Sequence, residues 1–428
     1  MTSTTVGTDP RLASRAVPRL LPDTASRTLD AHVERYGLLP RDVDDLVESV
    51  EHSGLVGRGG AGFPVGVKMR AVVDQRRAAV VVGNGTEGEP ASAKDKTLLT
   101  LNPHLVLDGA VASAVALGAR EVIICVDRSA VVAGEGVLSA IAERGRRRVD
   151  AVPIRVERAP SRYVAGEESA LVSWLNGGDA RPQFVPPRPF EKGVAGKPTL
   201  VQNVETLAHI GLIARFGPEW FRALGSTENS GTALITCSGA FGRSGVYEVP
   251  FGIALSKLFG ATRTDMDAAQ AVLIGGYFGT WFAADELPSV VLDGPSLRAR
   301  GSSFGCGVVA ALGTDRCGLA ESAHITRWLA GENAGQCGPC VNGLEAIANA
   351  MTQLVRGDHT RGAETNLRRW LEMVKGRGAC KHPDGAARFV ESSLRVFSAE
   401  IERHRRSGPC RAASFAPAFP LPKPGGWR

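Results

Sequence analysis

Apolar residues in the first half of this 428-residue chain alternate between short continuous runs and longer helical periods. Ala78–Val82 and Glu121–Val126 are short runs rich in β-branched residues, and Val152–Arg158 is a weaker third. Between the first two, Asp108–Ala119 is alanine-rich and predicts a helix. Short apolar runs separated by helices indicate buried parallel strands. The pattern predicts an α/β domain with a doubly wound parallel sheet and a ligand at the strands' carboxyl ends.

The pattern changes after the proline-rich connection at residues 182–189. A helical period resumes near 203–216, and short strands set off by glycines follow at Leu234–Thr236, Gly245–Val249 and Ala271–Ile274. Brief strands bounded by glycine are typical of a small mixed domain rather than of further βαβ units. We therefore expect a second, α+β domain here.

After about Gly301 the periodicity indicates mainly helices. The expected segments are 321–331, 343–356, 363–376 and 384–405. The pattern also predicts a short helix near Asp30–Tyr36 after a polar lead, and a disordered, proline-rich tail from Ser407.

Composition indicates an ordinary globular protein, with 43% hydrophobic and 22% charged residues. No apolar run is long enough to span a bilayer and the first thirty residues contain no secretory signal, so we expect a cytoplasmic protein that reaches a membrane only through partners. Residues 361–428 carry 14 Lys and Arg against 6 Asp and Glu. This basic end favours an acidic partner, although a solvated helix face explains it equally well. No nucleic-acid-binding module is present.

The segment Gly57–Pro64 has four glycines and carries the most information in the chain. A backbone almost free of side chains can approach a flat or phosphorylated ligand closely. Two acid-rich turns follow, at Asn84–Pro90 and Gly166–Ser169, and then Lys197–Thr206. Carboxylate and amide groups in such turns suit hydroxyl and amide donors on a nucleotide. Each segment alone fits a solvated turn, and only their combination predicts a nucleotide site.

Eight cysteines in a cytosolic chain favour metal or redox chemistry over disulfides. Cys337 and Cys340 form a C-x-x-C pair, and Cys380 is a third thiol ahead of a helix. Thiolates in this arrangement bind iron–sulfur clusters or zinc, and His382 would complete a Cys₃His zinc set. Cys306 and Cys317 are conceivable fourth ligands; Cys125 fits core packing, and Cys237 and Cys410 have no evident partner.

With these motifs in order, the chain resembles the flavoprotein (NADH-binding, F) subunit of complex I and of related NAD-linked hydrogenases and formate dehydrogenases. The resemblance covers about Gly54 to Arg403. The family's glycine loop GRGGAGFPTGLKW matches Gly57–Met69, and its NADE-x-EPG turn matches Asn84–Ala91. Its GEET and NNVET motifs match the segments that begin at Gly166 and Gln202.

The resemblance implies a Rossmann-like FMN-binding domain, a small ubiquitin-like (SLBB) α+β domain and a C-terminal helical bundle holding a 4Fe–4S cluster. The implied boundaries are 1–50 for the lead, 51–225 for FMN and the nicotinamide nucleotide, 226–300 for SLBB, 301–406 for the bundle and 407–428 for the tail. The FMN contacts that it implies are Gly59, Gly60, Lys68, Asn84, Glu87, Gly166, Glu167, Gln202 and Asn203. The rest of the glycine loop, Gly57, Arg58, Ala61, Gly62, Phe63 and Pro64, counts with them as cofactor-binding. It assigns NADH contacts to Phe63, Glu89 and Glu168, the two glutamates being the candidate catalytic residues. Its metal ligands are Cys337, Cys340 and Cys380.

The sequence departs from the family pattern at both cofactor sites. The family's first cluster cysteine is Ala334 here, which leaves a 3Fe–4S cluster, a 4Fe–4S cluster with a non-cysteine ligand, or no cluster as alternatives. At the nucleotide site, Thr86 stands where the family has an aspartate and Ala71 where it has an aromatic residue. Val185–Arg188 stands in place of the family's KPPF motif. Because a guanidinium pairs with phosphate, Arg188 favours NADPH over NADH.

The resulting hypothesis is an NADH dehydrogenase-like electron-transfer subunit. It passes electrons from NAD(P)H through FMN to an iron–sulfur cluster, and then to a quinone-linked complex, to other redox subunits or to an acidic ferredoxin-like carrier. FMN suits this role because it accepts two electrons together and releases them singly. The alternative is a non-catalytic assembly subunit with zinc in place of the cluster.

Overall fold

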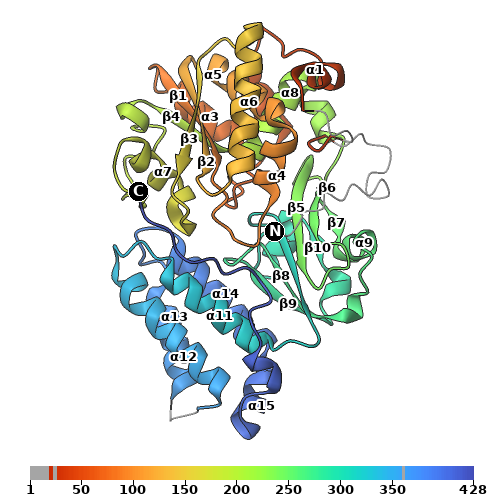
Figure 1. Cartoon of the computed structure of the whole chain (residues 1–428), viewed down its shortest axis with the longest axis vertical. Coiled ribbons are helices and arrows are strands. Elements are labelled where there is room, and N and C mark those ends of the chain that lie inside the picture. Colours follow the sequence, from red (N-terminus) through yellow and green to blue (C-terminus); the bar gives the residue numbers. More distant parts are fainter. Residues whose placement is uncertain (1–18, 23–26, 359–361) are drawn as a thin grey trace.

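The computed structural model describes residues 19–22, 27–358 and 362–428. Much of the expected N-terminal lead, residues 1–18 and 23–26, therefore lies outside the described residues. The described chain forms three consecutive parts (Figure 1). The first part consists of α1 (Leu29–Tyr36), α2 (Leu46–Ser53), α3 (Val65–Val73), β1 (Ala79–Gly85), α4 (Lys94–Leu101), α5 (Pro103–Ala116), β2 (Ala119–Asp127), α6 (Val131–Arg147), β3 (Ile154–Ala159), α7 (Glu168–Leu175), β4 (Thr199–Asn203) and α8 (Val204–Arg222).

Four parallel strands in the order β3-β2-β1-β4 form the sheet of the first part. Alternate residues of β1 face opposite sides, as the two-residue period of a strand requires. Val81 belongs to the core under α5 and α8, whereas Val80 and Val82 pack with Leu171 of α7 on the other side. Helices therefore cover both faces of the sheet, which confirms the predicted α/β class with a parallel sheet and the three strands expected from the apolar runs.

The second part is built on a mixed sheet in the order β6-β5-β11-β8-β9. Its elements are β5 (Thr232–Gly239), β6 (Gly245–Pro250), β7 (Ile253–Ala254), α9 (Leu255–Ala261), β8 (Ala269–Ile274), β9 (Thr280–Ala283), β10 (Val291–Leu292), α10 (Gly294–Arg298) and β11 (Val308–Gly313). The expected strands near 234, 245 and 271 correspond to β5, β6 and β8.

Strand β11 corrects the expectation that the chain is mostly helical after Gly301. It lies in the middle of the second sheet, parallel to β5 and antiparallel to β8. Five of its six residues are buried. A short apolar run bonded on both edges has no alternating pattern, so periodicity alone cannot distinguish it from a helical segment.

Helices make up most of the third part: α11 (Gly318–Gly331), α12 (Glu345–Arg356), α13 (Ala363–Val374), α14 (His382–Val396) and α15 (Ser398–Ser407), with a π-helical turn at Pro339–Leu344. These helices lie together below the two sheets in Figure 1. The single helix expected over 384–405 is two helices that meet at Phe397.

The C-terminal tail is placed against the protein, contrary to the expected disorder. Phe419 is buried, and its backbone N–H donates to Glu321 of α11 at 3.1 Å. Tyr277 and Trp328 donate from their side chains to the carbonyls of Pro420 and Pro422 at 2.6 and 2.7 Å. Proline removes backbone donors, so this extended segment satisfies its carbonyls with side chains of the folded core.

Candidate functional site

The first functional side chains stand where the parallel strands end. Asn84 of β1 pairs in register with Asn203 of β4. In the order β3-β2-β1-β4 the chain changes direction across the sheet between β1 and β4, which is where open α/β sheets bind ligands. Asn84 Nδ2 donates to the carbonyl of Gly166 at 2.7 Å, and Asn203 Oδ1 caps α8 by accepting from Glu205 N. Both asparagines are therefore fixed at the mouth of this crevice.

A cavity of about 530 Å³ opens at this edge and is lined by all three parts of the chain. From the first part come Arg58–Ala61, Asn84, Thr86–Glu89, Ser92, Lys94, Asp95, Tyr163, Val164, Gly166, Glu167 and Asn203. From the second and third come Gly275, Phe278, Ser303, Gly305, Cys306, Cys380–His382, Gly385 and Arg388. Its volume is in the range of small-molecule and cofactor pockets.

The glycine loop enters this cavity with its backbone. Arg58 is buried, and its guanidinium points away to donate to the carbonyls of Val56 and Thr232 at 2.9 and 3.0 Å. Gly59 and Gly60 then line the cavity; Gly60 has φ +112°, and a Cβ there would find no atom closer than 3.9 Å. The loop thus leaves open a space that any side chain would fill, which fits the approach of a flat or phosphorylated cofactor.

Glu89 is a buried carboxyl group of the cavity with a raised pKa. It accepts hydrogen bonds from Tyr277 N at 2.8 Å, from the Tyr163 hydroxyl at 3.1 Å and from Ala91 N at 3.2 Å. Burial raises the pKa of Glu89 to about 7, although these three bonds oppose the rise. Glu89 can therefore hold or release a proton near neutral pH inside the cavity.

Two other predicted glutamates line the cavity, and their carboxylates cap helices. Glu87, at φ 44°, accepts from the N–H groups of Asp95 and Lys96 at the start of α4 at 2.9 and 3.0 Å. Glu167 Oε2 accepts from Ser169 N and Ala170 N at the start of α7. Negative charge at a helix N-terminus is stabilising, so these residues fix the walls of the cavity.

Several predicted residues do not line the cavity. Lys68 and Glu168 form an ion pair at 2.5 Å instead. Phe63 is half-exposed, and Arg188 is exposed and outside the cavity lining. Gln202 is buried on β4, and its Nε2 has no hydrogen-bond partner among the described residues. Gly57, Gly62 and Pro64 belong to the loop but do not line the cavity.

A buried ion cluster in the wall of the cavity was missing from the sequence prediction. Lys94 Nζ lies 2.7 Å from Asp95 and 2.9 Å from Glu205, and Asn203 Nδ2 donates to Asp95 at 2.7 Å. Burial disfavours the charge on Lys94, but the two carboxylates outweigh it and raise its pKa. Lys94 and Asp95 directly follow an acid-rich turn, yet nothing in the sequence distinguishes them from solvent-facing charges. Tyr163 was also missed, because no motif marks it, whereas Cys306, considered from the sequence as a fourth cluster ligand, lines the cavity.

The three predicted metal-binding cysteines lie near one another beside this cavity. Cys340 is the second residue of the π-helical turn Pro339–Leu344. Burial, with Cys337 close by and Cys380 farther off, raises the pKa of the Cys340 thiol. Cys380 itself lines the cavity. Because the ligands of a cluster bind different iron atoms, its thiolates stand farther apart than those around one ion. The cavity and the three thiols are thus contiguous.

Ala334 and His382 define what else surrounds these cysteines. Ala334 is buried, and its carbonyl accepts from Arg181 at 3.1 Å. His382 bonds through Nε2 to the Leu329 carbonyl at 2.9 Å, while its buried Nδ1 has no partner among the described residues. Throughout the described chain, the only three metal-ligating atoms within 4.8 Å of one another belong to other residues. The Cys₃His zinc set is therefore not drawn together as a single-ion site.

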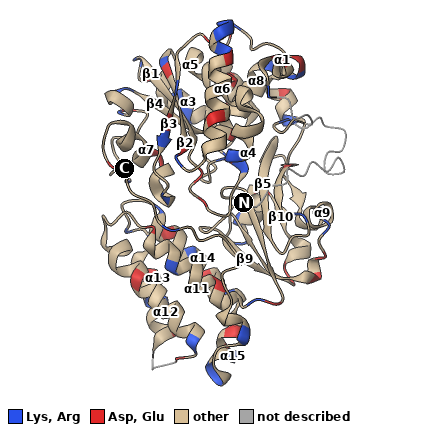
Figure 2. Cartoon of the chain, viewed as in Figure 1, with Lys and Arg blue, Asp and Glu red and all other residues tan. Residues whose placement is uncertain are grey.

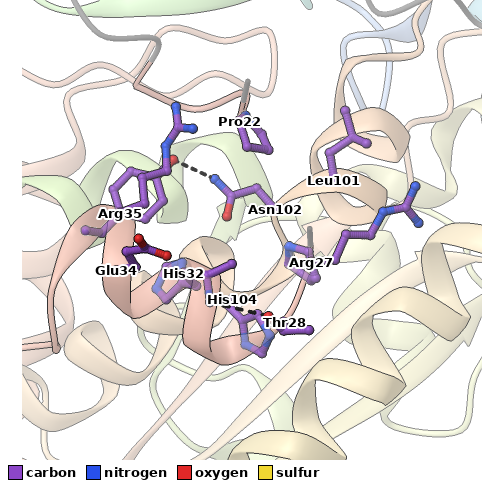
Figure 3. A pocket seen from close by; sticks show the side chains of 12 residues that line it. Pro22, Arg27, Thr28, His32, Glu34, Arg35, Leu101, Asn102 and His104 are labelled. Atoms are coloured by element: carbon purple, nitrogen blue, oxygen red, sulfur yellow. Dashed lines mark hydrogen bonds between the residues drawn. The ribbon is translucent and has the colours of Figure 1, made fainter. Parts of the chain in front are cut away.

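A second cavity, of about 290 Å³, lies away from the glycine loop. His32 enters it from α1, and Asn102 and His104 come from the junction of α4 and α5 (Figure 3). Asn102 Nδ2 donates to the Tyr36 hydroxyl at 2.9 Å. His32 Nε2 lies 2.5 Å from Asp108. These side chains are engaged in the core of the first part.

Charge on the third part is mixed rather than uniformly basic. Lys and Arg alternate with acidic residues along α13 and α15 (Figure 2). Glu402 pairs with both Arg405 and Arg406 on α15. Among the described residues no single helix is long and apolar enough to cross a membrane; α4 and α5 pass that test only together, and they bend by 95° where they meet.

Two family models match the chain. The Nuo51 FMN-binding domain matches residues 50–212, and the NADH-ubiquinone oxidoreductase-F iron-sulfur binding region matches residues 320–404. The first match contains the glycine loop and both asparagines. The second contains the three cysteines.

Whole-chain relatives give the same result. The chain is 31% identical over 380 residues to the F 2 subunit of NADH-quinone oxidoreductase from Rhizobium meliloti (strain 1021), covering 86% of this chain and 90% of the relative. It is 30% identical over 384 residues to the F subunit of the same enzyme from Rickettsia rickettsii (strain Sheila Smith), with 86% and 91% covered. A crystal structure of NAD⁺-reducing NiFe-hydrogenase in the air-oxidized state matches with a TM-score of 0.78 at 31% identity. That match covers 91% of this chain but only 66% of the hydrogenase chain.

Proposed function

The chain belongs to the family of the F subunit of NADH-quinone oxidoreductase, and from this premise we propose that it oxidises NAD(P)H with FMN and delivers electrons to an iron–sulfur cluster. The observation that supports it most is that one cavity is lined both by Gly59 and Gly60 of the glycine loop and by Cys380. In this proposal the first part is the Rossmann-like FMN domain, the second the SLBB domain and the third the cluster-binding bundle. Other redox subunits or an acidic ferredoxin-like carrier accept the electrons.

The residues of the cavity fit FMN. Gly59 and Gly60 leave room for the cofactor, and Asn84 and Asn203 present amides at the switch point of the sheet. Bound there, FMN would take two electrons as a hydride and release them one at a time. Glu89 faces the same space and would hold a proton on its carboxyl group near neutral pH.

Three cysteines fit a cluster with one position not supplied by cysteine. Cys337, Cys340 and Cys380 would hold three irons. His382 is two residues after Cys380, and its buried Nδ1 has no hydrogen-bond partner among the described residues, so it is a candidate for the fourth position. A three-iron cluster, and a four-iron cluster with a non-cysteine ligand, are both consistent with this set. Tyr163 and Phe278 pack edge-on against His382, which shields it from solvent.

Anaerobic absorption and EPR spectra of the purified protein, before and after NADH or NADPH, test the proposal. Bleaching of flavin bands together with a change in an iron–sulfur signal is the expected result. A cluster signal in the oxidised protein identifies the three-iron form. A colourless protein that contains zinc but neither flavin nor iron contradicts the proposal and favours the assembly role.

A matched glycine pair tests the flavin position. Gly60→Ala forces an L-residue into φ +112° and fills the open space, so we expect flavin content to fall by about tenfold or more. Gly145→Ala on α6 is the control, because a Cβ there meets nothing within 4 Å and the helix tolerates alanine. Equal flavin content in both variants would place FMN elsewhere.

A further inference from the structure

Three potential metal ligands converge at a place that the proposed electron path does not use. Cys317, His404 and Cys410 bring one Sγ, one imidazole nitrogen and a second Sγ within 4.8 Å of one another. Cys317 Sγ lies 3.7 Å from His404 Nε2. Cys317 and His404 are buried and Cys410 is partly buried. The cysteine motif assigned to the cluster includes none of them.

Neighbouring groups orient the histidine for coordination. His404 Nδ1 is 2.9 Å from the carbonyl of Val355, which can only accept, so the proton sits on Nδ1. Nε2 therefore presents its lone pair towards the two sulfurs. At present this lone pair accepts the backbone N–H of Cys410 at 3.2 Å, a long bond that a metal ion would replace. Metal-ligating histidines commonly have their second nitrogen bonded in this way.

The spacing suits one small tetrahedral ion. With Zn–S near 2.3 Å and Zn–N near 2.0–2.1 Å, a tetrahedral ion holds sulfur and nitrogen roughly 3.6 Å apart. The observed 3.7 Å between Cys317 Sγ and His404 Nε2 agrees with that separation. Glu400 lies one helical turn before His404 on α15, and its Oε2 is 3.5 Å from Cys317 Sγ. That oxygen also accepts from Leu319 N at 2.8 Å and lies outside the group of three ligand atoms within 4.8 Å of one another, so Glu400 would supply a fourth ligand only after its side chain moves.

We propose that Cys317, His404 and Cys410 bind a structural zinc ion, with the Glu400 carboxylate moving from its position beside Cys317 to become the fourth ligand. Coordination releases one proton from each thiol and leaves no open position for catalysis. The soft thiolates and the imidazole favour zinc over magnesium or calcium, which prefer oxygen ligands.

The place of this site in the fold indicates what the ion does. Cys317 caps the start of α11, His404 is on α15, and Cys410 begins the tail. The ion therefore joins the tail to two helices. Downstream, the Trp427 ring stacks under the guanidinium of Arg162 at 4.1 Å, and Arg162 pairs with Glu332 just after α11. Zinc would thus fix the start of the C-terminal segment, whose end contacts the loop before Cys337 through Arg162.

The site is separate from the cluster. Its ligand Cys317 stands at the N-terminal end of α11, whereas Cys337 follows the C-terminal end of that helix. A helix of 14 residues is about 20 Å long, so the two sites stand at opposite ends of a rigid element. Each should therefore keep its own metal when the other loses it.

Zinc and iron content of the purified full-length protein tests the proposal. We expect about one zinc per chain, lost in Cys410→Ala but kept in Cys337→Ala, with iron following the opposite pattern. Cys125→Ala, which removes a buried thiol of β2, is the matched control and should change neither metal. Absence of zinc from the wild type, or full zinc in Cys410→Ala, would overturn the proposal. Absence of iron from every sample would count against the cluster alone.

X-ray absorption at the zinc edge of the wild type needs no variant to fold. Two sulfurs near 2.3 Å with nitrogen or oxygen near 2.0–2.1 Å are expected. Three sulfurs would assign the zinc to the Cys337, Cys340 and Cys380 set and refute the proposal. Mass spectrometry of anaerobically alkylated protein that shows Cys317 joined to Cys410 by a disulfide would refute it as well.

Discussion

Two groups of cysteines stand at the two ends of α11, and the sequence shows only one of them. The first group, Cys337, Cys340 and Cys380, contains a pair separated only by a glycine and a proline. The second, Cys317, His404 and Cys410, joins residues 87 positions apart. Spacing motifs reveal ligands that share one turn of the backbone. Ligands that meet only through helix packing leave no local pattern, even when they lie within 4.8 Å of one another, as the second group does.

The two groups also differ in what surrounds them. Cys380 lines the same cavity as Gly59 and Gly60, which is the position that the proposed electron transfer requires of the first group. The second is enclosed by α11, α15 and the tail. A redox centre needs contact with its donor, while a structural ion needs a closed set of ligands. The comparison predicts that loss of the first group stops chemistry and that loss of the second loosens the fold.

Cys337→Ala gives the largest expected effect. Even the loss of a group that only hydrogen-bonds to a metal ligand costs about 10–100-fold, so removing a ligand should lower electron transfer to an artificial one-electron acceptor by more than about 100-fold. Flavin reduction by NAD(P)H should remain, because Cys337 does not line the cavity. Stopped-flow absorbance separates the two steps. Unchanged acceptor reduction in an iron-free variant would show that electrons leave the flavin by another route.

Cys410→Ala should affect stability and spare the chemistry. A ligand present at roughly 100 times its Kd stabilises a fold by about 3 kcal/mol, and the variant should lose an amount of that order. Thermal unfolding with and without a zinc chelator measures it. The chelator should lower the melting temperature of the wild type and leave the variant unchanged. If the chelator lowered the melting temperature of both proteins equally, zinc bound by the second group would not be what stabilises the fold.

The same contrast explains how much the sequence could predict. Strands β1, β2 and β3 were predictable because buried apolar runs mark them, and the ligand edge followed from the carboxyl ends of parallel strands, where Asn84 stands. Strand β4 (Thr199–Asn203), which brings Asn203 to the same edge, was not predicted. Strand β11 was missed because its apolar run is short and has no polar alternation. The tail was misjudged because proline content says nothing of the donor partners that Tyr277 and Trp328 supply from other parts of the chain.

Burial is the property that sequence reasoning could not supply. Glu89 and Glu168 were both predicted as nucleotide contacts from similar acid-rich turns. The structure buries Glu89 in the cavity and pairs Glu168 with Lys68 outside it. Lys94 has a sequence context like that of any surface lysine, yet two carboxylates hold it in the interior. Such differences arise from packing between distant segments, which no local pattern encodes.

Glu89→Gln tests that burial through the pH dependence of stability. The pKa of Glu89 rises from an ordinary 4.5 to about 7. Between these values the folded state keeps a proton that the unfolded state has lost, so the free energy of unfolding should fall as pH rises from about 4.5 to about 7. The contribution of Glu89 to the free energy of unfolding is no more than roughly 3 kcal/mol. Denaturant unfolding should show a flatter profile for Glu89→Gln, whereas the exposed control Glu135→Gln should keep the wild-type slope.

Ala334→Cys should have the smallest effect on the fold and the most specific one on the first group. One added sulfur at a buried position costs about 1 kcal/mol. It places a thiol where the family supplies its first cluster ligand, three residues before Cys337. If three cysteines bind the cluster in the wild type, this fourth should convert its EPR signal to that of an all-cysteine four-iron cluster, with zinc content unchanged. An EPR signal identical to that of the wild type would mean that Ala334 lies out of reach of the cluster. The alignment with the family motif would then have placed the missing ligand at the wrong residue. In that case only Cys337, Cys340 and Cys380 would represent the metal site that a sequence motif reveals, in contrast to the site formed by helix packing.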